Sequence, residues 1–245
     1  MTGRARTVAI AGLIVAAVHL GALLAGADGL ATASKALLVP ALAVFLLVTT
    51  ARPRSRMVRL TLVALAFSWL GDAVPALVAD DVSFLVMVGF FLCAQVAYIA
   101  AFAPTARRGP LRPRPAILVA YLATFALLLV ACVPGAGSLV GPVVGYGACL
   151  ATMAALATGV HPLAAVGGAV FLASDAMIAL GQFTTWFDPP AAGFWVMLTY
   201  LAGQVLLVAG VLAADRPAQP IVWTGAGSAM PEPSRRRSTG GSSRG

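Results

Sequence analysis

Charged side chains are scarce in this sequence. Asp, Glu, Lys and Arg together make up 10% of the 245 residues, while 60% of the residues are hydrophobic. A soluble domain carries about 25% charged residues, so this chain has too much apolar surface for one water-soluble core. Intrinsic disorder is disfavoured as well, because disorder requires low hydrophobicity. The composition is typical of a membrane protein.

Cysteine and histidine, which often bind metals, are also few. The three cysteines, Cys93, Cys132 and Cys149, lie inside apolar runs without metal-ligand spacing, and we interpret them as apolar filling residues. No cluster of His, Cys and carboxylates has the spacing of a metal site, and neither a phosphate-binding loop nor a Gly-x-Ser-x-Gly motif is present. The sequence therefore predicts neither a bound metal nor an organic cofactor.

Long apolar runs recur along the chain. A membrane-spanning helix needs about 20 mainly apolar residues, and these runs lack the period-two alternation of a β-barrel. The sequence therefore predicts an all-α membrane protein with eight transmembrane helices in one domain, residues 1–214. The first run could instead be a signal peptide, but its length and the even number of runs favour a retained helix. The predicted spans are 8–26, 33–49, 58–78, 83–103, 115–133, 139–158, 163–183 and 193–214.

The positive charge lies on one side of this predicted topology. Every arginine falls before the first span, after the eighth, or at the junctions between the second and third and between the fourth and fifth spans, whereas the opposite loops carry aspartates and no arginine. By the positive-inside rule both termini are expected in the cytoplasm of a multi-pass cell-membrane protein. The net charge of +8 is then explained by topology and contact with anionic lipid, so we expect no nucleic-acid partner.

The last part of the chain differs in composition from the rest. From Asp215 onward the sequence is rich in Pro, Gly, Ser and Arg. Such a composition does not support a packed core. The sequence predicts a disordered, basic cytoplasmic tail over residues 215–245.

Two of the predicted spans share a short motif. Residues 71–77 read GDAVPAL and residues 174–180 read SDAMIAL, which places Asp72 and Asp175 at equivalent positions four helices apart. At about 1.5 Å per residue both aspartates lie at similar depth, slightly beyond the membrane midplane. Two parallel four-helix halves related by an axis along the membrane normal would bring them together. Chance similarity in alanine-rich sequence is the alternative.

Asp72 and Asp175 are the candidate catalytic residues. They are the two acidic residues that lie deep in predicted spans, where an ionised side chain costs at least about 2.5–3.5 kcal/mol. Two carboxyls in one low-dielectric pocket cannot both ionise easily, so one is expected to hold a proton while the other stays charged. Such a pair supplies a general acid and a general base. A purely structural hydrogen-bonding role is the alternative.

Other polar side chains are predicted at similar depths. Gln95 and Tyr98, and likewise Tyr200 and Gln204, are spaced to share a helix face. A polar cavity opening toward the outer leaflet would collect such groups around the aspartates. Each has a structural alternative: a lysine can snorkel to the interface, a glutamine can hold helices together, and a tyrosine or lone histidine can simply pack. The further residues of this set are His19, Lys35 and Tyr146.

Several short motifs together resemble those of the YhhN-like family of membrane proteins, which includes the lysoplasmalogenases. The resemblance runs from about Lys35 to Gln204. It departs from the family pattern at Gln95, where histidine is frequent, and at Ala36, where proline often follows the lysine. The motifs are Ser34-Lys35 with Pro40, Gly71-Asp72, Gln95-x-x-Tyr98-Ile99-Ala100-Ala101-Phe102 and Phe171-x-x-Ser174-Asp175.

The resemblance implies hydrolysis of the vinyl-ether bond of a lysoplasmalogen, a lysophospholipid partner drawn from the bilayer. The products would be a fatty aldehyde and glycerophospho-ethanolamine or -choline. The resemblance also implies that Asp72 and Asp175 are the catalytic pair. The residues expected to bind substrate are Lys35, Gln95, Tyr98, Tyr146, Ser174, Tyr200 and Gln204.

A second function remains open from the sequence. A proton-coupled carrier of a small or lipid-like solute would use the same intramembrane aspartates as a proton relay. A helical scaffold without activity is the third reading. The sequence makes no prediction of the oligomeric state.

Overall fold

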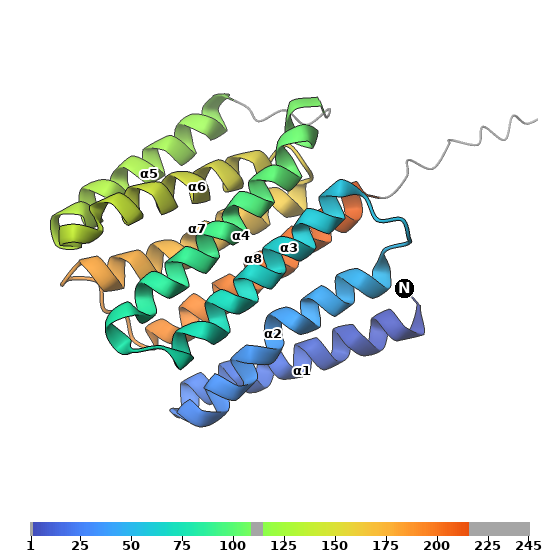
Figure 1. Cartoon of the computed structure of the whole chain (residues 1–245), viewed down its shortest axis with the longest axis horizontal. Helices are drawn as coiled ribbons and strands as arrows, with labels where there is room; N and C mark the ends of the chain where they lie inside the picture. The colour runs from blue at the N-terminus through green and yellow to red at the C-terminus, as the bar shows by residue number, and fades with distance from the viewer. Residues whose placement is uncertain (1, 109–114, 216–245) are drawn as a thin grey trace, which may run out of the picture.

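All regular secondary structure in the described residues is helical (Figure 1). This computed structural model describes residues 2–108 and 115–215; the predicted tail from residue 216 onward lies outside them, as do Arg112 and Arg114. The helices are α1 (Gly3–Ala25), α2 (Asp28–Thr49), α3 (Arg56–Ala73), α4 (Asp80–Arg108), α5 (Pro115–Ala136), α6 (Val140–Ala157), α7 (Pro162–Phe183) and α8 (Ala192–Ala214), with 3-10 turns η1 (Val74–Leu77) and η2 (Gly137–Leu139).

The predicted all-helical membrane fold is confirmed at the level of its helices. Seven helical segments in the described part of the chain are long and apolar enough to cross a membrane. One of them, Pro115–Ala157, contains both α5 and α6, which fold back on each other at η2 and lie side by side (Figure 1).

The helix ends differ from the apolar runs for identifiable reasons. Helix α1 begins at Gly3, before its apolar run, because the Thr2 hydroxyl caps it by accepting from the backbone N–H of Ala5. Helix α4 begins with Asp80 and Asp81, whose charges favour a helix N-terminus. Helix α3 ends at Ala73 and continues only as η1, whose first turn contains a proline. Hydropathy alone does not register these local interactions.

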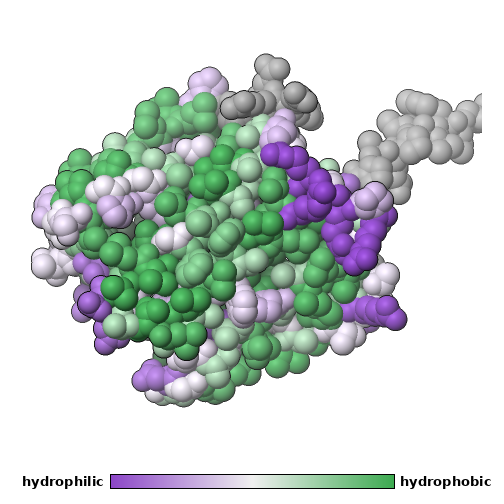
Figure 2. Space-filling model, viewed as in Figure 1, coloured by the Kyte–Doolittle hydropathy of each residue, from purple (hydrophilic) through white to green (hydrophobic). Residues whose placement is uncertain are grey.

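Figure 2 shows an outer surface dominated by hydrophobic residues, with hydrophilic residues gathered mainly at one end of the bundle. The N-terminus, the loop between α2 and α3 and the end of α8 lie at that end (Figure 1). Large apolar side chains face outward along the helices, such as Val130, which is 76% exposed. Such a surface suits a lipid environment, since water would be a poor solvent for it.

Glycines bring α7 and α8 into close contact. A Cβ atom placed on Gly167 would lie 2.6 Å from the backbone nitrogen of Leu207, and one on Gly210 would lie 2.5 Å from that of Ala164. Small residues at such positions let helix backbones approach closely, which is the usual basis of helix packing in membranes. This close pairing fixes α7, which carries Asp175, against α8.

Pro40 lies inside α2, and the backbone group that it frees has a partner. Proline has no N–H, so the Ala36 carbonyl four residues earlier lacks its helical hydrogen bond. The indole Nε1 of Trp69 on α3 donates to this carbonyl at 2.9 Å. The bond joins α2 to α3 one residue after Lys35 and three residues before Asp72.

Replacing Trp69 with phenylalanine should therefore lower the free energy of unfolding by about 0.5–1.5 kcal/mol, the net worth of one hydrogen bond. Thermal unfolding in detergent measures the change. Trp195→Phe is the matched control, because Trp195 is exposed and its indole donates to no described residue. Equal stability of the two variants would contradict a role for the Trp69 indole.

Candidate active site

Asp72 is held at the end of α3 by partners from two other helices. The carboxyl is buried, with the residue 8% exposed. The Lys35 ammonium on α2 lies 3.3 Å from its Oδ1 atom, and the Tyr200 hydroxyl on α8 donates to its Oδ2 atom at 2.8 Å. Both carboxyl oxygens are therefore engaged, one by a cation.

Asp175 lies within α7, eight residues before the end of the helix, and has different surroundings. It is also 8% exposed. The Tyr146 hydroxyl on α6 donates to its Oδ2 atom. Among the described side chains, no positively charged group forms an ion pair with Asp175. The two aspartates are therefore alike in burial and in having a phenol partner, but among the described residues only Asp72 pairs with a cation.

A second layer of hydrogen bonds lies one helical turn from Asp72. The Tyr98 hydroxyl on α4 donates to the Gln204 Oε1 atom at 2.6 Å, and the Gln204 amide nitrogen donates to the Ser68 hydroxyl at 3.1 Å. Ser68 precedes Asp72 by four residues and Gln204 follows Tyr200 by four, so each pair shares a helix face. The predicted site residues Tyr98 and Gln204 thus join α3, α4 and α8 beneath the Asp72–Tyr200 contact.

The other predicted site residues are all buried but differ in their partners. The Ser174 hydroxyl donates to the Val196 carbonyl on α8 at 2.9 Å. Gln95 is fully buried, and neither its amide nitrogen nor its oxygen bonds to any group in the part of the chain that is described. The Gln95 side chain lies near the Tyr146 hydroxyl, the group that also contacts Asp175.

His19 joins α1 to α2 next to the lysine of the site. Its Nδ1 atom lies 3.0 Å from the Ala31 carbonyl oxygen and 3.0 Å from the Ser34 hydroxyl. A carbonyl can only accept, so Nδ1 carries the proton in this arrangement. His19 thus anchors α1 on the turn of α2 that precedes Lys35.

A pocket with a volume of about 80 Å³ lies beside Asp175 between α4, α5, α6 and α7. The sequence predicted a polar cavity around both aspartates; this pocket is instead lined mainly by apolar side chains and contacts only Asp175 of the pair. The described residues that line it are Phe84, Met87, Val88, Phe91, Phe125, Leu128, Leu129, Cys132, Pro142, Val143, Tyr146, Gly147, Leu150, Ala151, Leu172, Asp175, Ala176, Ile178, Ala179 and Phe183.

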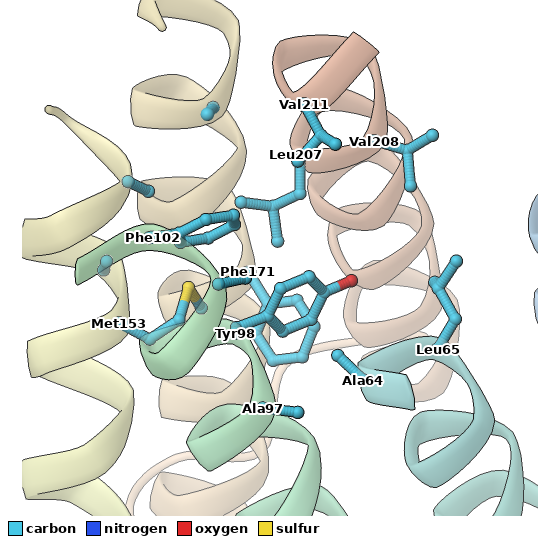
Figure 3. Close-up of a cluster of buried hydrophobic side chains, with 14 of the residues drawn as sticks. Ala64, Leu65, Ala97, Tyr98, Phe102, Met153, Phe171, Leu207, Val208 and Val211 are labelled. Carbon is cyan, nitrogen blue, oxygen red and sulfur yellow. The ribbon is translucent and has the colours of Figure 1, made fainter. Parts of the chain in front are cut away.

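The Phe91 ring contacts both the pocket and the neighbours of Asp72. It lies edge-to-face against the Tyr200 ring, with centroids 5.7 Å apart, and it also lines the pocket. A Cβ atom on Gly71 would lie 2.8 Å from this ring, so only glycine beside Asp72 leaves room for it. Figure 3 shows Tyr98 among Phe102, Met153 and Phe171, with its hydroxyl directed toward α8.

Sequence reasoning missed Ser68 and Phe91 as parts of the site. Ser68 lies four residues before Asp72, on the same helix face, and this spacing could have identified it. No signal marks Phe91, because one phenylalanine in an apolar helix resembles any other. Its role depends on the approach of α4 to Gly71, which is a tertiary feature.

The fold and the site together define a class: a helical bundle of the membrane-protein type with a buried pair of carboxyls, one paired with a lysine. Comparison with known proteins gives the family. The YhhN family model matches residues 30–211, and the chain belongs to this family, as the sequence motifs predicted.

Two curated relatives are named lysoplasmalogenase, one from Mycobacterium bovis and one from Mycobacterium tuberculosis. Each is 36% identical to this chain over 184 residues, which cover 73% of this chain and 67% of the relative. No solved structure matches the chain significantly.

Proposed function

We propose that this protein is an eight-span hydrolase of the cell membrane, with both termini in the cytoplasm, that cleaves the vinyl-ether bond of lysoplasmalogens. The similarity to proteins named lysoplasmalogenase supports the substrate. The unequal partners of Asp72 and Asp175 support the chemistry, and this difference is the observation on which the proposal depends.

The helix neighbours support an arrangement in two parallel halves. Sequential helices pack on each other within α1–α4 and again within α5–α8. Asp72 on α3 forms an ion pair with Lys35 of the preceding helix, α2. Asp175 on α7 accepts a hydrogen bond from Tyr146 of the preceding helix, α6. The proposed halves therefore place a cation next to one aspartate and a neutral phenol next to the other.

This difference assigns the two roles. A buried carboxylate is tolerated when a cation and hydrogen bonds compensate its lost hydration, and Asp72 has both. Asp175 lacks a cation among the described side chains, and a buried carboxyl without one favours the protonated form. We assign Asp72 as the ionised general base and Asp175 as the protonated general acid.

The reaction follows from these roles. Asp175 gives its proton to the β-carbon of the vinyl ether, which leaves an oxocarbenium ion stabilised by the Asp72 carboxylate. Asp72 removes a proton from water as the water oxygen bonds to this cation, forming a hemiacetal. Asp175 then takes the hemiacetal hydroxyl proton while Asp72 protonates the leaving glycerol oxygen, so the carbon–oxygen bond breaks and both aspartates return to their starting states.

Two neighbouring residues complete the proposed site. Lys35 is 32% exposed along its side chain, so its ammonium can also meet the phosphate of the substrate head group. The Phe91 ring lines the pocket and contacts the Tyr200 ring, so the substrate displaces this ring when its vinyl ether reaches both carboxyls. Oligomerisation is not required by this scheme.

The direct test is aldehyde release from lysoplasmalogen by the purified full-length protein in nanodiscs. We expect release from the ethanolamine or choline form and none from an ester lysophospholipid of the same chain length. Absence of aldehyde from both vinyl-ether forms would overturn the proposal. Uptake of a solute into liposomes driven by a pH gradient, without aldehyde, would establish the carrier instead.

A further inference from the structure

We propose that the pocket between α4, α5, α6 and α7 holds the single hydrocarbon chain of a lysophospholipid, and that this chain enters sideways from the bilayer between α4 and α5. This inference rests on the proposed function and adds to it the position of the substrate tail and its route.

The lining of the pocket indicates a hydrocarbon ligand. Among the described residues that line the pocket, Asp175 and Tyr146 have side-chain oxygen atoms, and nearly all the others are aliphatic or aromatic. A ligand that is apolar except at one end fits this distribution, because burial of apolar surface contributes about 25 cal/mol per Å². The polar end of such a ligand lies beside Asp175, where the proposed proton transfer takes place.

The helix contacts indicate the route. Helix α4 packs on α3 and α6, and α5 packs on α6 and α7, but α4 and α5 have no extensive contact with each other in the described structure. Both nevertheless line the pocket, through residues such as Met87 and Leu128. The equivalent pair in the proposed two-fold arrangement, α1 and α8, does make contact. The two proposed junctions between the halves thus differ, and on the side between α4 and α5 no extensive helix–helix contact closes the pocket in the described structure.

The end of the pocket near η2 is closed. Phe84 of α4 and Phe183 of α7 meet edge-to-face there, with ring centroids 5.6 Å apart. Gly135 near the end of α5 approaches α7 so closely that a Cβ atom would lie 2.0 Å from the Phe183 carbonyl oxygen. These contacts hold the ends of α4, α5 and α7 together, so a chain reaches the pocket from the side of the bundle.

The test fills the pocket and measures binding separately from hydrolysis. Ala179 lines the pocket one helical turn beyond Asp175, toward Phe183. The probe is a saturated 1-alkyl lysophosphocholine, which lacks the vinyl ether and so binds without reacting. We expect Ala179→Trp to weaken binding of a long-chain probe about tenfold or more, and that of a short-chain probe less, since each methylene excluded from an apolar pocket changes binding measurably.

Two further variants keep the test decisive. Ala126→Trp places the same side chain on the exposed face of α5, away from the pocket, and should change binding less than about twofold. Leu128→Trp fills the pocket from α5, in case Ala179→Trp does not fold, and should weaken binding as Ala179→Trp does. Folding of each variant is checked by thermal unfolding.

The outcomes separate the two proposals. If Ala179→Trp and Leu128→Trp bind the long-chain probe as tightly as the wild type, the tail position is wrong even if the wild type releases aldehyde. If both variants lose binding while the wild type releases no aldehyde, the tail position stands and the hydrolase proposal fails.

Discussion

Replacing Asp175 with asparagine should reduce aldehyde release from lysoplasmalogen by about 10²–10⁴-fold, the usual contribution of a general acid. An amide cannot give a proton to the vinyl-ether carbon, yet its oxygen can still accept the hydrogen bond from Tyr146. The fold should therefore persist while the chemistry stops. Initial rates of aldehyde release at saturating substrate, together with thermal unfolding, measure both properties.

Asp188→Asn is the matched control, because Asp188 lies exposed in the loop between α7 and α8. Its activity should equal that of the wild type. Asp72→Asn should lose activity to a similar extent as Asp175→Asn, because the base is then missing. An Asp175→Asn variant that keeps more than about a tenth of the wild-type rate would refute the assignment of Asp175 as the acid.

Replacing Lys35 with methionine should be both destabilising and inactivating. The change leaves the Asp72 carboxyl buried without its cation. Breaking a buried ion pair costs about 3–5 kcal/mol, and we expect about 3 kcal/mol here because the Lys35 side chain is partly exposed. Unfolding of the variant and the wild type in the same detergent gives the difference.

The double variant Lys35→Met with Asp72→Asn distinguishes charge pairing from simple packing. Asparagine carries no charge, so the double variant should recover most of the lost stability, while its activity stays absent. Such non-additivity is the expected signature of two groups in direct contact. If the double variant is as unstable as Lys35→Met alone, the lysine acts through packing and not through its charge.

Most of the helical architecture could be predicted because lipid imposes a simple requirement on sequence. Every predicted apolar run overlaps one of the eight described helices, and five of the runs lie wholly within a helix, since backbone polar groups in a bilayer must be paired within the segment. The ends could not be predicted as well. The capping hydroxyl of Thr2 and the acidic first turn of α4 extend their helices by interactions that hydropathy does not contain.

The sequence singles out the candidate site residues but not their partners. Asp72 and Asp175 stand out because acids are rare in such helices, and in the structure each of these buried aspartates accepts a hydrogen bond from a tyrosine hydroxyl. Which tyrosine meets which aspartate depends on how α6, α7 and α8 pack. Lys35 in particular could have snorkelled to the interface, and its contact with Asp72 follows from the approach of α2 to α3.

The pocket illustrates a different limit of sequence reasoning. Polar residues at similar depth predicted a shared polar cavity, but Tyr98, Ser174 and Gln204 direct their polar atoms to other groups within the bundle. Small residues such as Gly147 and Ala151 instead leave room for an apolar pocket. The position of a cavity depends on how several side chains pack together, so no single residue in the sequence predicts it.

Hydrolysis in heavy water tests the proposed reaction most directly. Asp175 exchanges its proton with solvent, so the account predicts one deuterium on the carbon next to the carbonyl of the released aldehyde, seen by mass spectrometry after rapid reduction to the alcohol. Cleavage on the glycerol side of the ether oxygen would release an enol that also gains deuterium, so the oxygen atom is followed in ¹⁸O-labelled water. The account predicts a glycerophospho product without ¹⁸O, whereas cleavage on the glycerol side would place ¹⁸O in it. An aldehyde free of deuterium would contradict protonation of the vinyl ether, and with it the acid–base roles of the two aspartates.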